Sequence, residues 1–135
     1  MDASFDYLLL WATINVNLLI HTDMKEKKLS NIVIKMAQQI LCKKNPSPAA
    51  IDVAVNIVHI AWNFAHEKYK DEPGYIFSVK EIQERIDSAN NEFISGDVEE
   101  MTKILMLYKL KNYPNDKRNI VLCEVKNGDV RVIFL

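Results

Sequence analysis

The chain has 135 residues, of which 49% are apolar and 26% are charged. This length suits one compact domain, and this composition excludes a disordered tail or a fibrous repeat, so we expect a single domain over residues 1–135. Seventeen basic and eighteen acidic residues give a formal net charge of -1. That balance excludes the strong overall positive charge with which many proteins bind nucleic acids or anionic membranes.

The two cysteines, Cys42 and Cys123, are too few for a disulfide framework and lack the CxxC spacing of zinc or redox sites. They favour a reducing compartment. The longest apolar stretch, residues 7–20, has about fourteen residues, whereas a bilayer span needs ~20. Acidic residues precede it, where a secretion signal is positively charged. We therefore expect a cytoplasmic protein with no membrane partner.

Apolar residues at helical spacing predict three helices in the first half of the chain. The first covers Ser4–His21 and the second covers Asp23–Lys43. Pro48 suits the first position of a helix and Ser47 its N-cap, so the third helix begins there and runs to about Lys70. Because apolar residues cover more than one side of this third helix, we expect it to be the central one.

Two more helices are predicted by their start and stop signals. Ser78 and Glu81 have the spacing of a capping box and open a fourth helix, which ends before Gly96. Asp97, with an acidic residue three positions later, repeats the start signal for a fifth helix. Pro114 ends that helix, because proline has no N–H to donate.

The last segment changes to a pattern typical of strands. Asn119–Lys126 and Asp129–Leu135 are joined by Asn127-Gly128, two residues that tolerate the positive φ angles of a tight turn. A two-residue loop also fixes the register of a hairpin. The predicted cross-strand pairs are Lys126–Asp129, Val125–Val130, Glu124–Arg131, Cys123–Val132 and Leu122–Ile133.

The register divides the side chains between two faces. One face carries Val121, Cys123, Val125, Val130, Val132 and Phe134, and the other carries Ile120, Leu122, Ile133 and Leu135. An isolated hairpin is only marginally stable, so we expect it to pack on helices and to gain a third strand. That strand comes from the apolar run Tyr75–Phe77, whose alternative is a helical lead-in, or from a second copy in a homodimer. The expected fold is α+β and mostly helical, with five helices followed by a C-terminal β-hairpin.

A stripe of polar side chains follows the predicted third helix at steps of three and four residues: Asp52, Asn56, His59, Asn63, His66 and Lys70. Two histidines among amides and a carboxylate are able to bind a metal or move a proton. His59 and His66 are seven positions apart, whereas metal-binding pairs on one helix are three or four apart. We therefore expect no metal site, and we interpret the stripe as the solvent-facing side of a mostly buried helix. An enzyme that uses these histidines is the third alternative for the function.

Most catalytic motifs are missing from the sequence. The three glycines lie at predicted breaks or turns, so there is no glycine-rich loop to bind phosphates. The GxSxG and HExxH motifs, the Cys/His zinc spacings and the EF-hand loop are also absent. We therefore expect no enzymatic activity and no cofactor.

Charge is distributed unevenly along the chain. Residues 71–102 carry nine acidic and two basic side chains, a net charge of -7. Such a surface attracts and orients a basic protein partner. We therefore expect a small protein-binding module of the inhibitor, immunity-protein or antitoxin kind. The candidate partner-binding residues are Glu81, Glu84, Asp87, Glu92, Asp97, Glu99 and Glu100.

The order of elements over about residues 48–135 suggests a second hypothesis. A helix, a short strand at Tyr75–Phe77, two further helices and a hairpin resemble the winged-helix fold, which often binds DNA. The resemblance implies phosphate contacts from Lys103, Lys109, Lys111, Lys117, Arg118, Lys126 and Arg131. The recognition helix of that fold would begin with Glu99 and Glu100, which phosphates repel, so a nucleic-acid partner is the second alternative.

Overall fold

The computed structural model of the chain describes residues 28–66, 73–86 and 90–135. The predicted first helix, Ser4–His21, lies outside them. The chain divides into two units, Met1–Ile32 and Val33–Leu135, and each is described by itself. Of the first unit, residues 28–32 are described, and they contain the beginning of α2 (Leu29–Gln38). The single domain over residues 1–135 stays a prediction.

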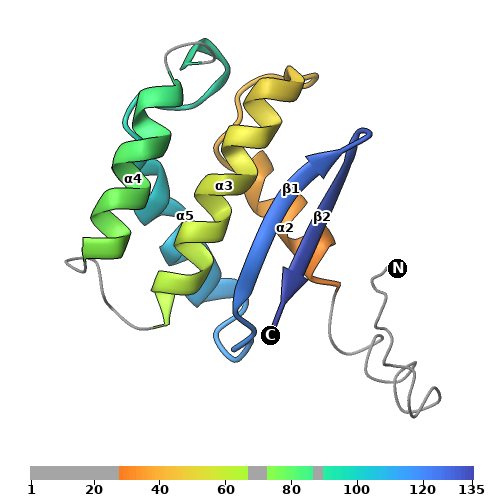
Figure 1. Cartoon of the computed structure of the whole chain (residues 1–135), viewed down its shortest axis with the longest axis vertical. Coiled ribbons are helices and arrows are strands. Elements are labelled where there is room, and N and C mark those ends of the chain that lie inside the picture. The colour runs from red at the N-terminus through yellow and green to blue at the C-terminus, as the bar shows by residue number, and fades with distance from the viewer. Residues whose placement is uncertain (1–27, 67–72, 87–89) are drawn as a thin grey trace. The chain divides into compact units, whose positions relative to one another are not determined.

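The described residues form an α+β structure, as predicted. Helices come first and an antiparallel hairpin comes last in the chain (Figure 1). The elements after α2 are α3 (Pro48–Ala65), α4 (Pro73–Arg85), a short 3-10 turn (Asn90–Glu92), α5 (Val98–Asn112), β1 (Ile120–Lys126) and β2 (Asp129–Phe134).

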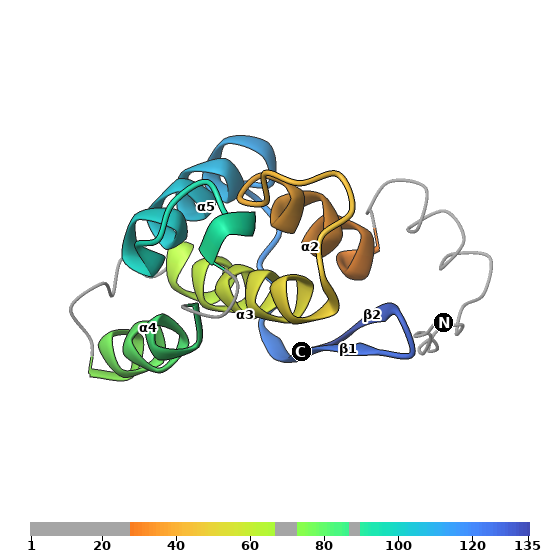
Figure 2. The same ribbon diagram turned by 90° about the horizontal axis from the view of Figure 1, so that it is seen from above.

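Helix α3 is the centre of the second unit. It begins at Pro48, as predicted, because the Ser47 hydroxyl accepts a hydrogen bond from the Ala50 N–H at 3.1 Å. It packs against α4, α5 and β1, and Figure 2 shows it between them. Among the described helices, α3 alone is long and apolar enough to cross a membrane, and 56% of it is buried inside the protein. Ten of its residues form much of the core: Ala50, Val53, Ala54, Val55, Ile57, Val58, Ile60, Ala61, Trp62 and Ala65.

The short strand predicted at Tyr75–Phe77 is wrong, because these residues belong to α4. Alternate residues of a strand share a face, whereas residues two apart on a helix point in nearly opposite directions. Tyr75 is 1% exposed and Phe77 is 61% exposed, as a helix requires. The Tyr75 ring packs edge-on against Phe64 of α3, with 5.2 Å between ring centroids, so a tertiary contact overrides the strand preference of these residues.

Several predicted helix boundaries also change. The capping box at Ser78 lies inside α4, which begins five residues earlier at Pro73 and ends at Arg85 instead of before Gly96. Beyond it, the backbone around Phe93 forms an isolated bridge with Leu41. Leu41 follows α2, because that helix ends at Gln38 and not at the predicted Lys43. Helix α3 ends at Ala65 instead of near Lys70.

The predicted fifth helix is confirmed at both ends. Asp97 is the N-cap of α5, and its carboxylate accepts hydrogen bonds from the N–H groups of Glu99 and Glu100. The helix ends at Asn112, two residues before Pro114. Local start and stop signals are sufficient here because both act within one turn of the helix.

The predicted register of the hairpin is confirmed for all five pairs. Asn127 and Gly128 have φ angles of 53° and 84°, as the tight turn requires. The prediction of the two faces is wrong at the open end, because a bulge at Val121 shifts the register between Ile120 and Leu122. As a result Ile120 is 3% exposed and is buried like Cys123, which was predicted on the other face, whereas Val121 is 53% exposed.

Candidate functional site

The polar stripe of α3 is half-buried and meets the hairpin, which corrects its interpretation as a solvent-facing surface. Asn63 makes two hydrogen bonds with the backbone of Ile120. Its Nδ2 donates to the carbonyl oxygen and its Oδ1 accepts from the N–H, both at 2.9 Å. The adjacent Trp62 donates its Nε1–H to the carbonyl oxygen of Arg118 at 2.6 Å. These side chains therefore hold the start of β1 against α3.

The other described members of the stripe have structural contacts too, whereas Lys70 lies outside the described residues. Asp52 pairs with Arg85 of α4, and Asn56 donates to the Asp52 carbonyl oxygen at 2.7 Å. Burial lowers the pKa of His59, with a smaller opposing effect from the Ile120 backbone. The His66 Nδ1 lies 3.5 Å from the Lys109 ammonium. Among residues 28–66, 73–86 and 90–135, no cluster of histidine, cysteine and carboxylate side chains is arranged to hold a metal ion.

Lys109 of α5 is a fully buried lysine. Its ammonium donates to the carbonyl oxygens of Tyr113 and Asp116 at 2.8 and 2.6 Å. It also lies 4.3 Å from the centre of the Trp62 ring. Burial lowers the pKa of Lys109 from 10.5 to about 8, although the Asp116 carboxylate acts in the opposite direction. No local pattern in the sequence indicates this cluster, because its members come from α3, α5 and the loop before β1.

The bases that the winged-helix resemblance implies do not form one exposed surface. Lys109 is buried, and Arg118 pairs with Asp116 and stacks on Phe134. Arg131 pairs with Glu124 at 3.4 Å. Lys103 pairs with Glu99 at 3.8 Å. The other three, Lys111, Lys117 and Lys126, are exposed and come from three separate segments.

Glu92 differs from the other predicted partner-binding residues because it is buried. Its carboxylate accepts hydrogen bonds from the Ser47 N–H at 2.7 Å and from the Ser47 hydroxyl at 2.6 Å. Glu92 therefore stabilises the N-cap residue of α3 and does not face solvent. These hydrogen bonds lower the pKa of Glu92, against a smaller opposing effect of burial.

Replacement of Glu92 by glutamine is expected to destabilise the protein more at neutral pH than in acid. The folded-state pKa lies below the unfolded value, so this carboxylate stabilises the protein above its ordinary pKa and loses that effect as the pH falls. The thermal midpoints of the wild type and Glu92→Gln should therefore converge from pH 7 to about pH 3. Glu81→Gln, at an exposed carboxylate, is the matched control. An equal difference at both pH values would contradict this role of Glu92.

Three of the predicted acidic residues gather at the start of α5. Asp97 caps the helix, Glu99 pairs with Lys103, and Glu100 accepts a hydrogen bond from the Ser95 hydroxyl at 2.9 Å. Negative charges are favourable at this end of a helix because of the helix dipole. All three carboxylates are exposed while they make these local contacts. Asp87 lies outside the described residues.

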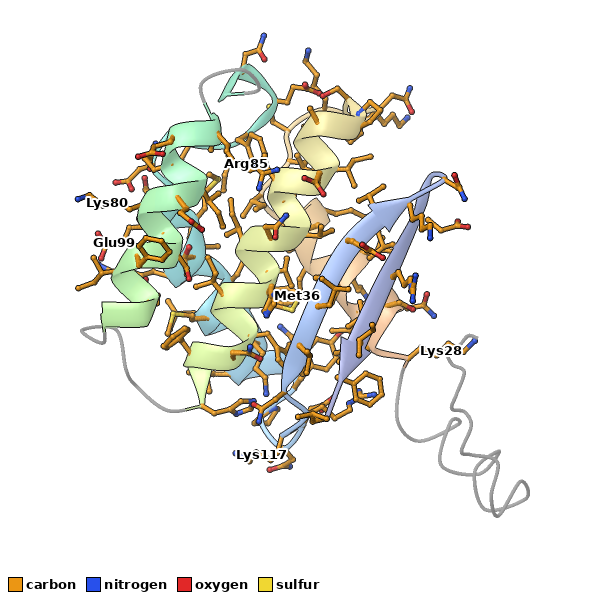
Figure 3. The ribbon with its side chains drawn as sticks, viewed as in Figure 1. Lys28, Met36, Lys80, Arg85, Glu99 and Lys117 are labelled. Atoms are coloured by element: carbon orange, nitrogen blue, oxygen red, sulfur yellow. The ribbon has the colours of Figure 1, made fainter. Side chains whose placement is uncertain are left out.

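The remaining two acidic residues, Glu81 and Glu84, lie on the outer surface of α4 beside an exposed aromatic residue. Phe77, Glu81 and Glu84 are at positions i, i+4 and i+7 of the helix and therefore share one face. Ile76 and Lys80 are exposed on the same side of the helix, and Figure 3 shows the labelled Lys80 pointing away from α3. We call these five residues the α4 surface: Ile76, Phe77, Lys80, Glu81 and Glu84.

Helix α4 is held in place by side chains at its C-terminal end. Gln83 donates to the Gly96 carbonyl oxygen and accepts from the Val98 N–H, both at 2.8 Å, so it joins α4 to the start of α5. Arg85 pairs with Asp52 of α3. Figure 3 shows the labelled Arg85 between α4 and α3. These contacts orient the α4 surface outward. The sequence analysis missed Phe77 because it predicted a strand at Tyr75–Phe77. Phe77 shares a face with Glu81 and Glu84 only when this segment is helical.

Comparisons of the chain with models of protein families, with curated proteins and with solved structures find no match.

Proposed function

We propose that the chain is a protein-binding module that binds a basic protein partner through the α4 surface, as inhibitors, immunity proteins and antitoxins bind their targets. The observation that carries this proposal is the exposed Phe77 ring beside Glu81 and Glu84 on one face of α4. A few aromatic residues commonly supply most of the binding energy of a protein interface. Carboxylates around such a residue attract a basic partner and set its orientation.

The contacts that hold α4 on α3 and α5 support the same proposal. A surface that is already ordered before binding loses less conformational freedom in the complex. The contacts of Gln83 and Arg85 provide this order without using the side chains of the α4 surface. The partner therefore meets a helix that is fixed on both α3 and α5.

The protein acts by forming a complex and not by catalysis in this proposal. Burial and structural contacts engage groups of α3 that the sequence offers for chemistry, because His59 and Asn63 meet β1. The buried Lys109 orders the loop after α5. Cys123 is buried, and burial raises the pKa of its thiol to about 12. Both cysteines are free thiols, which supports a location in the reducing cytoplasm.

The experiment is affinity capture of the tagged full-length chain from its source cells, with nuclease treatment of half the lysate. The variants are Phe77→Ala and the double charge reversal Glu81→Lys with Glu84→Lys. We expect one basic protein to be retained by the wild type in both halves. Each variant should weaken the complex about thirtyfold or more, the effect of losing an interface residue that dominates binding.

The matched controls change similar side chains on other surfaces. Leu107→Ala removes an apolar side chain of α5 that is 69% exposed, and Asp129→Lys reverses a charge at the hairpin turn. Both should retain the partner as the wild type does. Retention by Phe77→Ala at the wild-type level, or recovery of nucleic acid with proteins that nuclease removes, would contradict the proposal.

A further inference from the structure

The outer edge of β2 has no main-chain partner among the described residues. Their sheet has two strands, and β1 lies between α3 and β2 (Figure 1). In an antiparallel pair, the backbone N–H and C=O groups of every second residue bond to the neighbouring strand. The backbone groups of the residues between them point to the opposite edge. The pair closing the two-residue turn, Lys126–Asp129, is a bonded pair. The residues of β2 that present N–H and C=O groups to the free edge are therefore Val130, Val132 and Phe134.

The strand at this edge also lacks several features that keep exposed strands from pairing. Proteins protect such edges with proline, lysine or a bulge. The sequence of β2, DVRVIF, contains neither proline nor lysine, and the bulge lies on β1. The base of β2, Arg131, is already paired with Glu124 of β1. Within the described part of the chain, this edge is thus open to another strand.

We propose that two copies of the chain pair antiparallel along β2, with the two-fold axis at Val132, to form a four-stranded sheet. In this register Val132 lies opposite the partner's Val132, and Val130 lies opposite the partner's Phe134. All the outward-pointing backbone groups of β2 are then bonded across the axis. The inference concerns a different surface from the proposed function, because α4 and β2 lie on opposite sides of α3 (Figure 1).

Charge selects this register over its neighbours. A shift by one position of the axis toward the turn places Arg131 opposite the partner's Arg131, and like charges directly opposite destabilise a sheet. A shift the other way leaves only residues 132–134 of β2 paired. In the register centred on Val132, Arg131 lies opposite the partner's Ile133 and keeps its own Glu124.

The apolar side chains favour a second copy as the occupant. Phe134 and Ile133 are large apolar residues of β2 that remain exposed in the single copy. In the paired strands Phe134 meets the partner's Val130, a combination of aromatic and β-branched residues that stabilises sheets. On the other face, the Ile133 residues of the two copies become diagonal neighbours. Interfaces between identical chains are more apolar than the interfaces of transient complexes. The exposed Ile133 and Phe134 of β2 fit an interface of this apolar kind.

The test places a lysine either on β2 or on β1 and measures dimer formation of the full-length chain by analytical ultracentrifugation. Ile133→Lys places a lysine opposite the partner's Arg131 twice in each dimer, so the dimer dissociation constant should rise about tenfold or more. Leu122→Lys is the matched control, since Leu122 is 39% exposed and Ile133 is 41% exposed on the same face. The control lies on β1, away from the axis, and should dimerise as the wild type does.

Amide hydrogen exchange then locates the interface. The amides of Val130, Val132 and Phe134 should be protected in the wild-type dimer and exchange faster in Ile133→Lys. A wild type that stays monomeric would overturn the proposal, and so would a dimer that Ile133→Lys leaves intact. Protection of these three amides in a monomer would also overturn it, because the edge would then be covered by the chain itself.

Discussion

Replacement of Lys109 by methionine is expected to lower the free energy of unfolding by about 2–4 kcal/mol at pH 7. Methionine fills the space of the aliphatic chain but donates no hydrogen bond. The carbonyl oxygens of Tyr113 and Asp116 would lose their donor, and the Trp62 ring would lose its cation. The release of a buried charge offsets part of this loss. Urea unfolding measures the difference.

The pH dependence of this difference separates the lysine from a simple packing effect. The pKa of Lys109 is about 8 in the folded protein and 10.5 ordinarily, so the unfolded chain binds more protons between these values. The wild type therefore gains stability as the pH rises through this range, and Lys109→Met does not. The difference between them should widen from pH 8 to about pH 10.

The matched control is Lys111→Met, at an exposed lysine of the same helix. It should change the free energy of unfolding by about 0.5 kcal/mol or less. If Lys109→Met is as stable as the wild type, the ammonium does not order the loop from α5 to β1. A difference that stays constant with pH would contradict the lowered pKa.

Replacement of Asn63 by leucine should cost about 2–4 kcal/mol of unfolding free energy. Leucine has a similar size but leaves both the N–H and the carbonyl oxygen of the buried Ile120 without the partners they have in Asn63. Each unsatisfied backbone group in such a position carries a desolvation cost. The amide of Ile120 should also lose its protection from hydrogen exchange.

Asn56→Leu is the matched control for this substitution. Asn56 lies on the same stripe of α3 but bonds to the carbonyl oxygen of Asp52 in its own helix. We expect a change of about 1 kcal/mol or less. Equal effects of the two leucine variants would show that Asn63 does not hold the hairpin on α3.

The sequence predicts best those features that local chemistry decides. The tight turn at Asn127-Gly128 fixes the register of five pairs, and Asp97 fixes the start of α5. Long-range contacts decide the features that were missed. The bulge at Val121 occurs where the backbone of Ile120 is bound by Asn63, 57 residues earlier. No pattern near Val121 indicates that contact.

The predicted partner-binding residues also divide into those that local sequence describes correctly and those that long-range contacts decide. Charge and spacing predict exposed carboxylates on this segment, and Glu81 and Glu84 are exposed on α4. Glu92 has the same residue type but is buried against Ser47, which sequence spacing does not reveal. Phe77 was missed because aromatic residues favour strands in isolation, whereas the packing of Tyr75 on Phe64 makes this segment helical.

Site-specific photocrosslinking in the source cells tests the α4 surface most directly. A photoreactive residue at position 77 or 84 should crosslink the full-length chain to one discrete basic protein. The same residue at position 107, on the exposed side of α5, should give no such product. A crosslink from position 107 to that protein, or crosslinks from position 77 to nucleic acid alone, would contradict a partner-binding role for the α4 surface.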